Sequence, residues 1–315
     1  MTKFLNDKTP AGFSTPTALP KTPEESRQWQ DANRRWWESH PMRYDFGDHV
    51  GEREFSPAFY RTIDDRFFRD VKTFMPWKTI PFDNLIEFDS LRQKRVLEIG
   101  VGSGSHAQLL AEHAESFVGV DITDYAVRST RERLRLMGLK GDIIRMDAEH
   151  MEFPDNSFDF VWSWGVIHHS SNTENVLREI LRVLRPGGKA ITMVYHRTVW
   201  NYLIVSGLVH GIIQGGLQQT RSLHKTRQLW MDGALARFYS ISEWRTLTSQ
   251  FFSVEDIKVF GSKAELVPLP RGRVKNGILM VFPDSLSRLI TNRCKFGTFL
   301  VSALKKSPLF ESSLQ

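Results

Sequence analysis

The chain has 315 residues, of which 41% are hydrophobic and 25% are charged, and its formal net charge is +6. This balance is typical of a soluble globular protein and excludes a disordered or fibrous chain. The single cysteine, Cys294, excludes an internal disulfide framework and a cysteine-based metal centre, and it predicts a reducing, cytoplasmic setting.

The N-terminal segment has two parts of different composition. Residues 1–25 are rich in proline, threonine and serine, which predicts a flexible arm, and they lack the apolar run of a secretion signal. Residues 26–92 are crowded with aromatic side chains, too many to remain in water. They predict a helical cap packed on the rest of the protein, with one helix expected over residues 57–74 from its apolar spacing.

Strands and helices then alternate from residue 93 to residue 307. The alternation predicts an α/β fold with a doubly wound, mostly parallel, seven-stranded Rossmann-like sheet. The expected strands are residues 95–100, 116–121, 142–147, 158–165, 189–196, 254–261 and 297–304. Two irregular insertions, at about 198–238 and 262–295, interrupt the pattern, and residues 308–315 form a tail.

The first expected strand leads into a glycine-rich turn, VLEIGVGSGSH over residues 96–106, with glycines at 100, 102 and 104. Glycine lets the backbone turn tightly and approach a ligand, and the N-terminus of the following helix presents free amides. This pattern predicts a nucleotide-like cofactor. Because Gly102, Gly104 and Ala107 also fit G-x-G-x-x-A, a dinucleotide stays open at this point.

Acidic residues end the next two expected strands. Asp121 follows Gly100 by 21 residues, where a carboxylate can accept hydrogen bonds from the hydroxyls of a ribose. Asp147 ends the third strand and precedes Ala148, where it can accept from an adenine amino group. The three strand ends together predict an adenosine-binding edge.

These residues resemble the class I S-adenosylmethionine-dependent methyltransferases, in particular the small-molecule group of methyltransferase type 11. The resemblance rests on E-x-G-x-G-x-G at 98–104, VGVDIT at 118–123, RMDAEHMEFPDNSFDFVWSWGVIHH at 145–169 and LREILRVLRPGGKAITM at 177–193. It implies S-adenosyl-L-methionine as cofactor, S-adenosyl-L-homocysteine as its product, and no metal. The sequence SWGV replaces the Asn/Asp-Pro-Pro-Tyr motif used on nucleobase amines, so we expect no DNA substrate.

The resemblance also implies a role for each residue of the cofactor site. The three glycines would pass close to the methionyl and ribose portions, with Glu98 orienting their turn. Asp121 would hold the ribose and Ile122 would pack on the adenine face. Asp147 and the Ala148 amide would contact the adenine edge, and Trp164 would border the sulfonium. The predicted cofactor residues are therefore Glu98, Gly100, Gly102, Gly104, Asp121, Ile122, Asp147, Ala148 and Trp164.

Methyl transfer is an in-line displacement, so the protein mainly positions the nucleophile, and a general base helps where that nucleophile is protonated. His168 and His169 follow the fourth strand and are the candidate bases; packing at a helix start is the alternative for both. Tyr195 and His196 end the fifth strand on the same rim. They are candidate substrate contacts, with a structural role at the sheet edge as the alternative.

The positive charge lies in the last third of the chain. Residues 197–306 hold 16 basic and 6 acidic residues, a pattern that indicates an anionic substrate, RNA, a membrane surface or an ordinary solvated face. Two basic clusters occur there, Arg221, Lys225 and Arg227, and Arg271, Arg273 and Lys275. The apolar insertion after residue 198 predicts a helix that packs in the cap, walls a substrate pocket or dips into a membrane interface.

The expected function is therefore methyl transfer to an oxygen, nitrogen or carbon atom of a small, partly apolar metabolite. The basic C-terminal third of the chain adds an anionic metabolite to the expected acceptors. The alternatives are an RNA or protein methyltransferase, an NAD-linked oxidoreductase and a catalytically silent S-adenosylmethionine-binding protein. The expected partner is a small-molecule acceptor, RNA is disfavoured, and membrane contact and oligomeric state are left open.

Overall fold

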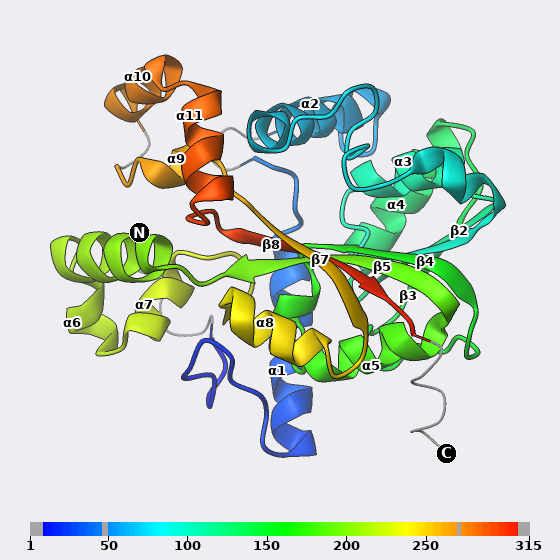
Figure 1. Cartoon of the computed structure of the whole chain (residues 1–315), viewed down its shortest axis with the longest axis horizontal. Helices are drawn as coiled ribbons and strands as arrows, with labels where there is room; N and C mark the ends of the chain where they lie inside the picture. The colour runs from blue at the N-terminus through cyan, green and yellow to red at the C-terminus, as the bar shows by residue number, and fades with distance from the viewer. Residues whose placement is uncertain (1–8, 46–49, 270–271, 308–315) are drawn as a thin grey trace.

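The computed structural model describes residues 9–45, 50–269 and 272–307 (Figure 1). Its centre is an eight-stranded sheet with the order β3-β2-β1-β4-β5-β8-β7, and β6 pairs with β5. β8 runs antiparallel to both of its neighbours, β5 and β7, and the other pairings among the described strands are parallel. The strands are β1 Arg95–Ile99, β2 Ser116–Asp121, β3 Asp142–Arg145, β4 Phe158–Trp164, β5 Leu184–His196, β6 Phe238–Tyr239, β7 Ser253–Phe260 and β8 Phe299–Lys305.

The predicted α/β fold with a mostly parallel sheet is confirmed, with one strand more than expected. The additional strand, β6, is only two residues long and adds to β5 at Tyr195 and His196. Two residues are too few to show the alternation from which a strand is predicted. The central order, in which β1 lies between β2 and β4, places a reversal of strand order at the carboxyl end of β1.

Helices cover both faces of the sheet (Figure 1). Successive strand residues point to opposite faces, so Val96 and Trp162 pack with one set of helices while Leu97 and Val161 pack with the other. The first set is α2 Pro57–Phe74, α3 Ser105–His113 and α4 Asp124–Leu136, and the second includes α5 Thr173–Val183 and α8 Ile241–Thr248. Both faces are therefore buried, as a parallel sheet requires.

The N-terminal segment packs against the rest of the chain. Helix α1 Pro23–Ser39 begins after Thr22, whose hydroxyl accepts from the Glu25 amide, and a proline occupies its first turn. Before it, Phe13 is only 1% exposed and meets Trp29 edge to face at 5.4 Å. The Arg237 guanidinium donates to the Ala18 carbonyl over 2.8 Å. Residues 9–22 thus contact the rest of the described chain, and the flexible arm expected over residues 1–25 stays a prediction; residues 1–8 and the predicted tail at 308–315 lie outside the described residues.

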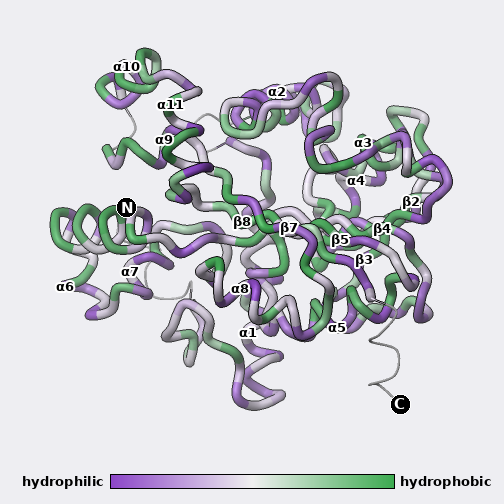
Figure 2. The backbone as a smooth tube through the Cα atoms, viewed as in Figure 1, coloured by the Kyte–Doolittle hydropathy of each residue, from purple (hydrophilic) through white to green (hydrophobic). Residues whose placement is uncertain are grey.

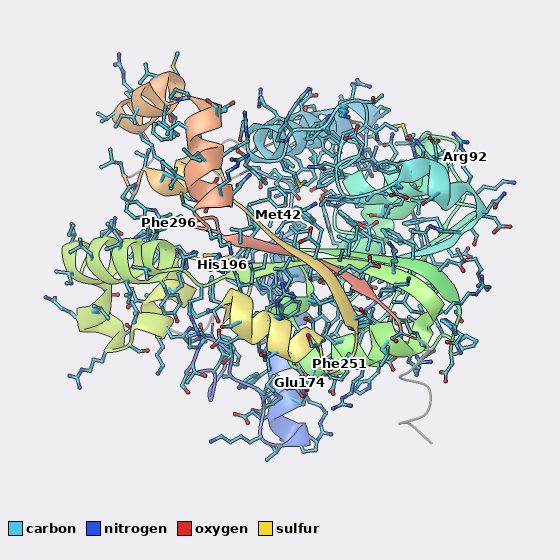
Figure 3. The ribbon with its side chains drawn as sticks, in the orientation of Figure 1. Met42, Arg92, Glu174, His196, Phe251 and Phe296 are labelled. Atoms are coloured by element: carbon cyan, nitrogen blue, oxygen red, sulfur yellow. The ribbon has the colours of Figure 1, made fainter. Side chains whose placement is uncertain are left out.

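Both insertions lie at the end of the sheet where β5 finishes, on the left in Figure 1. The first includes the helix η3 Val199–Ile213, which is largely hydrophobic (Figure 2). The second precedes β8, and Phe296 at its C-terminal end lies close to His196 (Figure 3). The insertions comprise η3 Val199–Ile213, α6 Gly216–Thr220 and α7 Leu223–Leu229, then α9 Lys263–Leu266, α10 Arg273–Val281, α11 Asp284–Arg288 and η4 Leu289–Arg293. Across the three described ranges, no helix has both the length and the apolar character needed to cross a bilayer.

Candidate functional site

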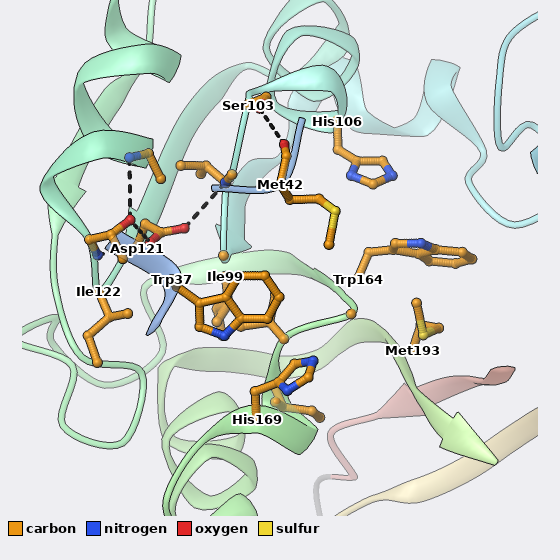
Figure 4. A pocket seen from close by; sticks show the side chains of 18 of the residues that line it. Trp37, Met42, Ile99, Ser103, His106, Asp121, Ile122, Trp164, His169 and Met193 are labelled. Carbon is orange, nitrogen blue, oxygen red and sulfur yellow. Dashed lines mark hydrogen bonds between the residues drawn. The ribbon is translucent and has the colours of Figure 1, made fainter. Parts of the chain in front are cut away.

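A cavity of about 330 Å³ opens at the carboxyl ends of the parallel strands (Figure 4). The loops after β1, β2, β3 and β4 form one side of it, and α1 and α2 contribute the other. Most of the predicted cofactor residues line it, namely Gly100, Gly102, Asp121, Ile122, Asp147, Ala148 and Trp164, whereas Glu98 and Gly104 lie behind the lining. The structure thus brings three separate strand ends to one cavity.

The glycine turn needs glycine at each of its three positions for backbone reasons. Gly100, Gly102 and Gly104 have φ values of +82°, +53° and +81°, a region that other residues enter only with strain. A Cβ on Gly100 would lie 2.1 Å from a methyl carbon of Val166, whereas a Cβ on Gly102 would meet no protein atom within 4 Å. Gly104 is the N-cap of α3.

The first two of these glycines give a matched pair of substitutions. We expect Gly100→Ala to lower the free energy of unfolding by about 2–5 kcal/mol, because it combines backbone strain with overlap on Val166, a branched side chain whose Cβ also lies too close. Gly102→Ala should cost only about 1–2 kcal/mol, from backbone strain alone. Urea unfolding of both variants measures the difference, and equal losses would contradict the packing described here.

Asp121 joins the ends of β1 and β2. One carboxylate oxygen accepts from the amide and the hydroxyl of Thr123, over 2.9 and 2.7 Å, and the other accepts from the Gly102 amide over 3.3 Å. Burial raises the pKa of Asp121, and the Thr123 donors oppose that rise. Asp147 is held similarly, by the Gln30 side chain at 2.7 Å and the Glu149 amide at 2.9 Å. A carboxylate has about four acceptor sites, so both keep capacity for ligand hydroxyl or amino groups.

Two buried polar atoms on lining residues have no hydrogen-bond partner in the part of the chain that the structure describes. They are the Asn33 side-chain oxygen, from α1, and Nε2 of His106, from α3. Because native proteins pair nearly all such groups, these two indicate a ligand or ordered water in the cavity. A polar, nucleoside-containing cofactor such as S-adenosylmethionine fits this cavity, because it could bind both the strand-end carboxylates and these two unpaired groups.

Glu98 supports the turn from behind. Its carboxyl is 1% exposed, and burial, reinforced by the charge of Asp121, raises its pKa well above its usual range. Oε1 lies 3.8 Å from Nδ1 of His106, whose own pKa burial lowers to about 3, so that imidazole is neutral. Burial therefore disfavours the charged form of both groups, which lie next to the stacked rings of Trp162 and Trp164.

This environment predicts a pH effect on stability. A carboxyl whose pKa is higher in the folded than in the unfolded chain destabilises the fold as pH rises from about 4.5 through the raised value. Glu98→Gln keeps the shape of the protonated acid, so we expect it to stabilise the protein more at pH 8 than at pH 5. Urea midpoints at the two pH values measure this, and parallel pH profiles for variant and parent would show that Glu98 is ionised in the fold.

The structure separates the two candidate bases, which are adjacent in sequence. His169 lines the cavity, and its Nδ1 lies 2.7 Å from the Leu235 carbonyl, so Nδ1 carries the proton and Nε2 carries the lone pair. His168 is fully buried, is absent from the lining, and packs against Tyr195 with ring centres 4.1 Å apart and ring planes tilted by 48°. Burial lowers the pKa of His168 well below its usual range. The geometry favours His169 for contact with an acceptor.

The two candidate substrate contacts differ in the same way. Tyr195 lines the cavity, whereas His196 does not. Nδ1 of His196 lies 2.8 Å from the Gly297 carbonyl, which ties β5 to the turn before β8. Because alternate residues of a strand point to opposite faces of the sheet, the side chains of Tyr195 and His196 point in opposite directions. The geometry therefore favours the structural alternative for His196.

Sequence reasoning missed most of the cavity wall that the N-terminal segment supplies. Trp37, on α1, lies over the cavity and meets the His169 ring at 5.1 Å, edge to face. In Figure 4, Asp121 and Ile122 lie at one side of the cavity and His106, Trp164 and Met193 at the other. The missed residues include Gln30, Asn33, Trp37, Met42, Tyr44, Phe67, Phe74, Asp232 and Phe299. The density of aromatic residues before residue 78 was the available signal, but it did not say which of them face a ligand.

The charge of the lining differs from that expected for an anionic acceptor. Four carboxylates line the cavity, Asp70, Asp121, Asp147 and Asp232, and no lysine or arginine is among its described lining residues. The two basic clusters of the C-terminal third therefore lie elsewhere, except that Arg271 falls outside the described residues. No residue of η3, α6 or α7 lines the cavity either, although Asp232, near the end of the same insertion, does. The apolar helix η3 therefore does not wall the pocket, and packing in the cap and membrane contact remain as its predicted roles.

Comparison with known proteins agrees with this geometry. The family model described as Methyltransferase domain matches residues 97–192. The phthiotriol/phenolphthiotriol dimycocerosates methyltransferase of Mycobacterium tuberculosis is 39% identical over 97 residues, 30% of this chain and 35% of that protein. The ubiquinone/menaquinone biosynthesis C-methyltransferase of Azotobacter vinelandii is 33% identical over 119 residues, 36% of this chain and 47% of that protein.

A solved SAM-dependent methyltransferase from Methanosarcina mazei is 18% identical, with a TM-score of 0.49 over 73% of this chain and 99% of that chain. The chain spans between about a third and a half of the length of the curated relatives named above. The region that the family model matches, residues 97–192, carries the glycine turn, both strand-end aspartates and the residues around β4. Residues 97–192 are therefore similar to a methyltransferase domain, and they contribute the strands β1 to β4 whose ends meet at the cavity.

Proposed function

We propose that the protein transfers a methyl group from S-adenosylmethionine to a small, apolar, uncharged acceptor. One observation carries this proposal: a single cavity joins a polar end, with the two strand-end aspartates, to an apolar end. The apolar end is built by Phe67 and Phe74 of α2, Met193 and Tyr195 of β5, and Phe299 of β8. An aromatic and aliphatic wall of this kind suits a ring or a hydrocarbon chain.

The electrostatics of the lining support an uncharged acceptor. An anionic acceptor would have to enter beside Asp70 and Asp232 with no lining cation among the described residues to offset the repulsion. The names of the relatives point the same way, since one acts on phthiotriol-type dimycocerosates and the other in quinone biosynthesis. We therefore set aside the anionic acceptor that the basic C-terminal third indicated.

The proposed residue roles follow from their positions. Bound S-adenosylmethionine supplies an electrophilic methyl group on a cationic sulfur. Asp121 would accept from the ribose hydroxyls and Asp147 from the adenine amino group, while Trp164 would border the sulfur. His169 would accept the proton of the acceptor's nucleophilic atom at Nε2. Trp37 would cover the cavity and exclude water.

Transfer of a tritiated methyl group into fractionated cell extracts tests this proposal. We expect label in a neutral, solvent-extractable pool that contains lipids and quinones, and no label in water-soluble anionic metabolites, RNA or protein. Asp121→Asn, run in parallel, should remove that label. Label confined to RNA or to anionic metabolites would contradict the proposal.

A further inference from the structure

Large apolar side chains are exposed on both insertions. On η3 the exposed residues are Val199, Leu203, Leu208, Ile212 and Ile213, and on α10 they are Val274, Ile278, Met280 and Val281. Ile213, Met280 and Val281 are 71%, 86% and 80% exposed, far more than residues of a core normally are. We call these nine residues the apolar face. Apolar side chains concentrated on two elements indicate a surface that meets another apolar phase.

On η3 the exposed residues form one stripe. Val199, Leu203, Leu208 and Ile212 follow one another at intervals of four, five and four residues. Because η3 has the i→i+5 hydrogen bonds of a π-helix, four to five residues make about one turn, so these side chains lie on one side. The opposite side of η3 is buried through Tyr202, Ser206 and Gly211. The stripe is thus the outward side of an amphipathic helix.

The two insertions are joined to each other. The indole of Trp200, on η3, donates to the Glu265 carbonyl of α9 over 3.0 Å and lies 6.5 Å from the Phe296 ring. The Glu265 carboxylate in turn accepts from Ser262 and Thr298. Both insertions also lie at the same end of the sheet in Figure 1. The two parts of the apolar face are therefore carried by one connected unit.

Basic residues outnumber acidic residues in the two segments that carry the apolar face. Residues 198–231 contain three basic and no acidic residues, and so do residues 266–283. Arg221, Lys225 and Arg273 are exposed. Asp284, just after the second segment, lies 2.7 Å from the Lys263 ammonium. The charge of this surface is therefore complementary to an anionic partner.

We propose that the apolar face and the exposed basic residues of the same two segments dock the protein on an anionic lipid bilayer. Apolar side chains enter the headgroup and acyl boundary while lysine and arginine remain at the headgroups, which is how interfacial helices bind. The surface also adjoins the apolar end of the cavity, because β5 runs from Tyr195 into η3 and η4 leads into β8 at Phe299. Docking would place that end of the cavity near a membrane-dissolved acceptor. This inference goes beyond the proposed function and needs no methyl transfer.

Flotation of the full chain with vesicles tests the proposal. We expect the protein to float with vesicles that contain phosphatidylglycerol, and far less with pure phosphatidylcholine. Lys225→Ala with Arg273→Ala should weaken binding to the anionic vesicles by about 25-fold, since each basic residue near such a surface contributes about fivefold. Ile213→Glu with Val281→Glu should weaken it at least as much. Met137→Glu is the matched control, because Met137 is an exposed apolar residue beyond the end of α4, outside both insertions.

Retained S-adenosylhomocysteine binding and an unchanged circular dichroism spectrum show that each variant is folded. The docking proposal is overturned if the parent protein ignores anionic vesicles, or if the Ile213/Val281 variant floats as well as the parent. It is also overturned if sedimentation shows a lipid-free dimer that the same variant splits, because the apolar face then belongs to a second copy. Vesicle binding and cofactor binding are separate readouts, so failure of one proposal is distinguishable from failure of the other.

Discussion

His169→Gln is expected to lower kcat for methyl transfer by roughly 10²–10⁴-fold, the usual contribution of a positioned general base. The affinity for S-adenosylhomocysteine should stay within about twofold of the parent value, because His169 lies apart from Asp121 (Figure 4). Glutamine preserves a side-chain donor for the Leu235 carbonyl but offers no basic nitrogen. Single-turnover rates with the labelled cofactor measure the loss directly.

His168→Gln is the matched control for this variant. His168 is fully buried beside Tyr195 and does not line the cavity, so its replacement should lower the melting temperature while kcat changes little. We therefore expect opposite results for the two variants in the measurements of kcat and of melting temperature. Full turnover in His169→Gln, or lost turnover in a folded His168→Gln protein, would remove His169 as the base.

Asp121→Asn is expected to weaken S-adenosylmethionine binding by at least ~100-fold. Hydrogen bonds to a charged group are worth about 1.5–3 kcal/mol each, and the neutral amide loses the charge that strengthens two bonds to the ribose. The melting temperature should fall only slightly, because the asparagine oxygen can keep the two bonds from Thr123 and only the long bond from the Gly102 amide is lost. Equilibrium dialysis with labelled cofactor provides the measurement.

Asp142→Asn is the control for this second variant, since Asp142 is an exposed aspartate at the start of β3 that does not line the cavity. It should bind the cofactor as the parent does. Normal binding by Asp121→Asn would show that the cofactor lies elsewhere. A loss shared equally by both variants would show that net charge, rather than a specific carboxylate, governs affinity.

The sheet and the cofactor end of the cavity were predictable from sequence because both depend on local patterns. Strands buried on both faces are short apolar runs, and their ligand-facing ends carry glycine or aspartate, as at Gly102, Asp121 and Asp147. The turn geometry at Gly100 is likewise a local property of φ. Such features need no knowledge of distant residues.

The parts that escaped prediction depend on contacts between residues far apart in the chain. The bond from Gln30 to Asp147 spans 117 positions, and nothing near Gln30 in sequence marks it as a cavity residue. Buried Arg237 contacts the N-terminal segment through Ala18 and also donates to the carbonyls of Ser170 and Ser171, which ties that segment to the residues after β4. These arrangements arise only when the cap folds over the sheet.

The exposed apolar stripe of η3 escaped prediction for a different reason. The exposed stripe repeats at the period of a π-helix, so a test for the α-helical period of 3.6 finds no amphipathic side. The same limit applied to the two histidines, since His168 and His169 are equivalent to any pattern until the short helix η2 Ile167–His169 turns only one of them to the cavity. Charge counting also misled, because the basic excess lies outside the described cavity lining.

Calorimetric titration of the purified protein with S-adenosylhomocysteine, and separately with NAD, is the most direct test of the central claim that one cavity at the strand ends holds a sulfonium nucleoside. The account predicts saturable binding of S-adenosylhomocysteine at one site per chain and no heat from NAD. Binding of NAD, or an absence of S-adenosylhomocysteine binding by folded protein, would contradict it.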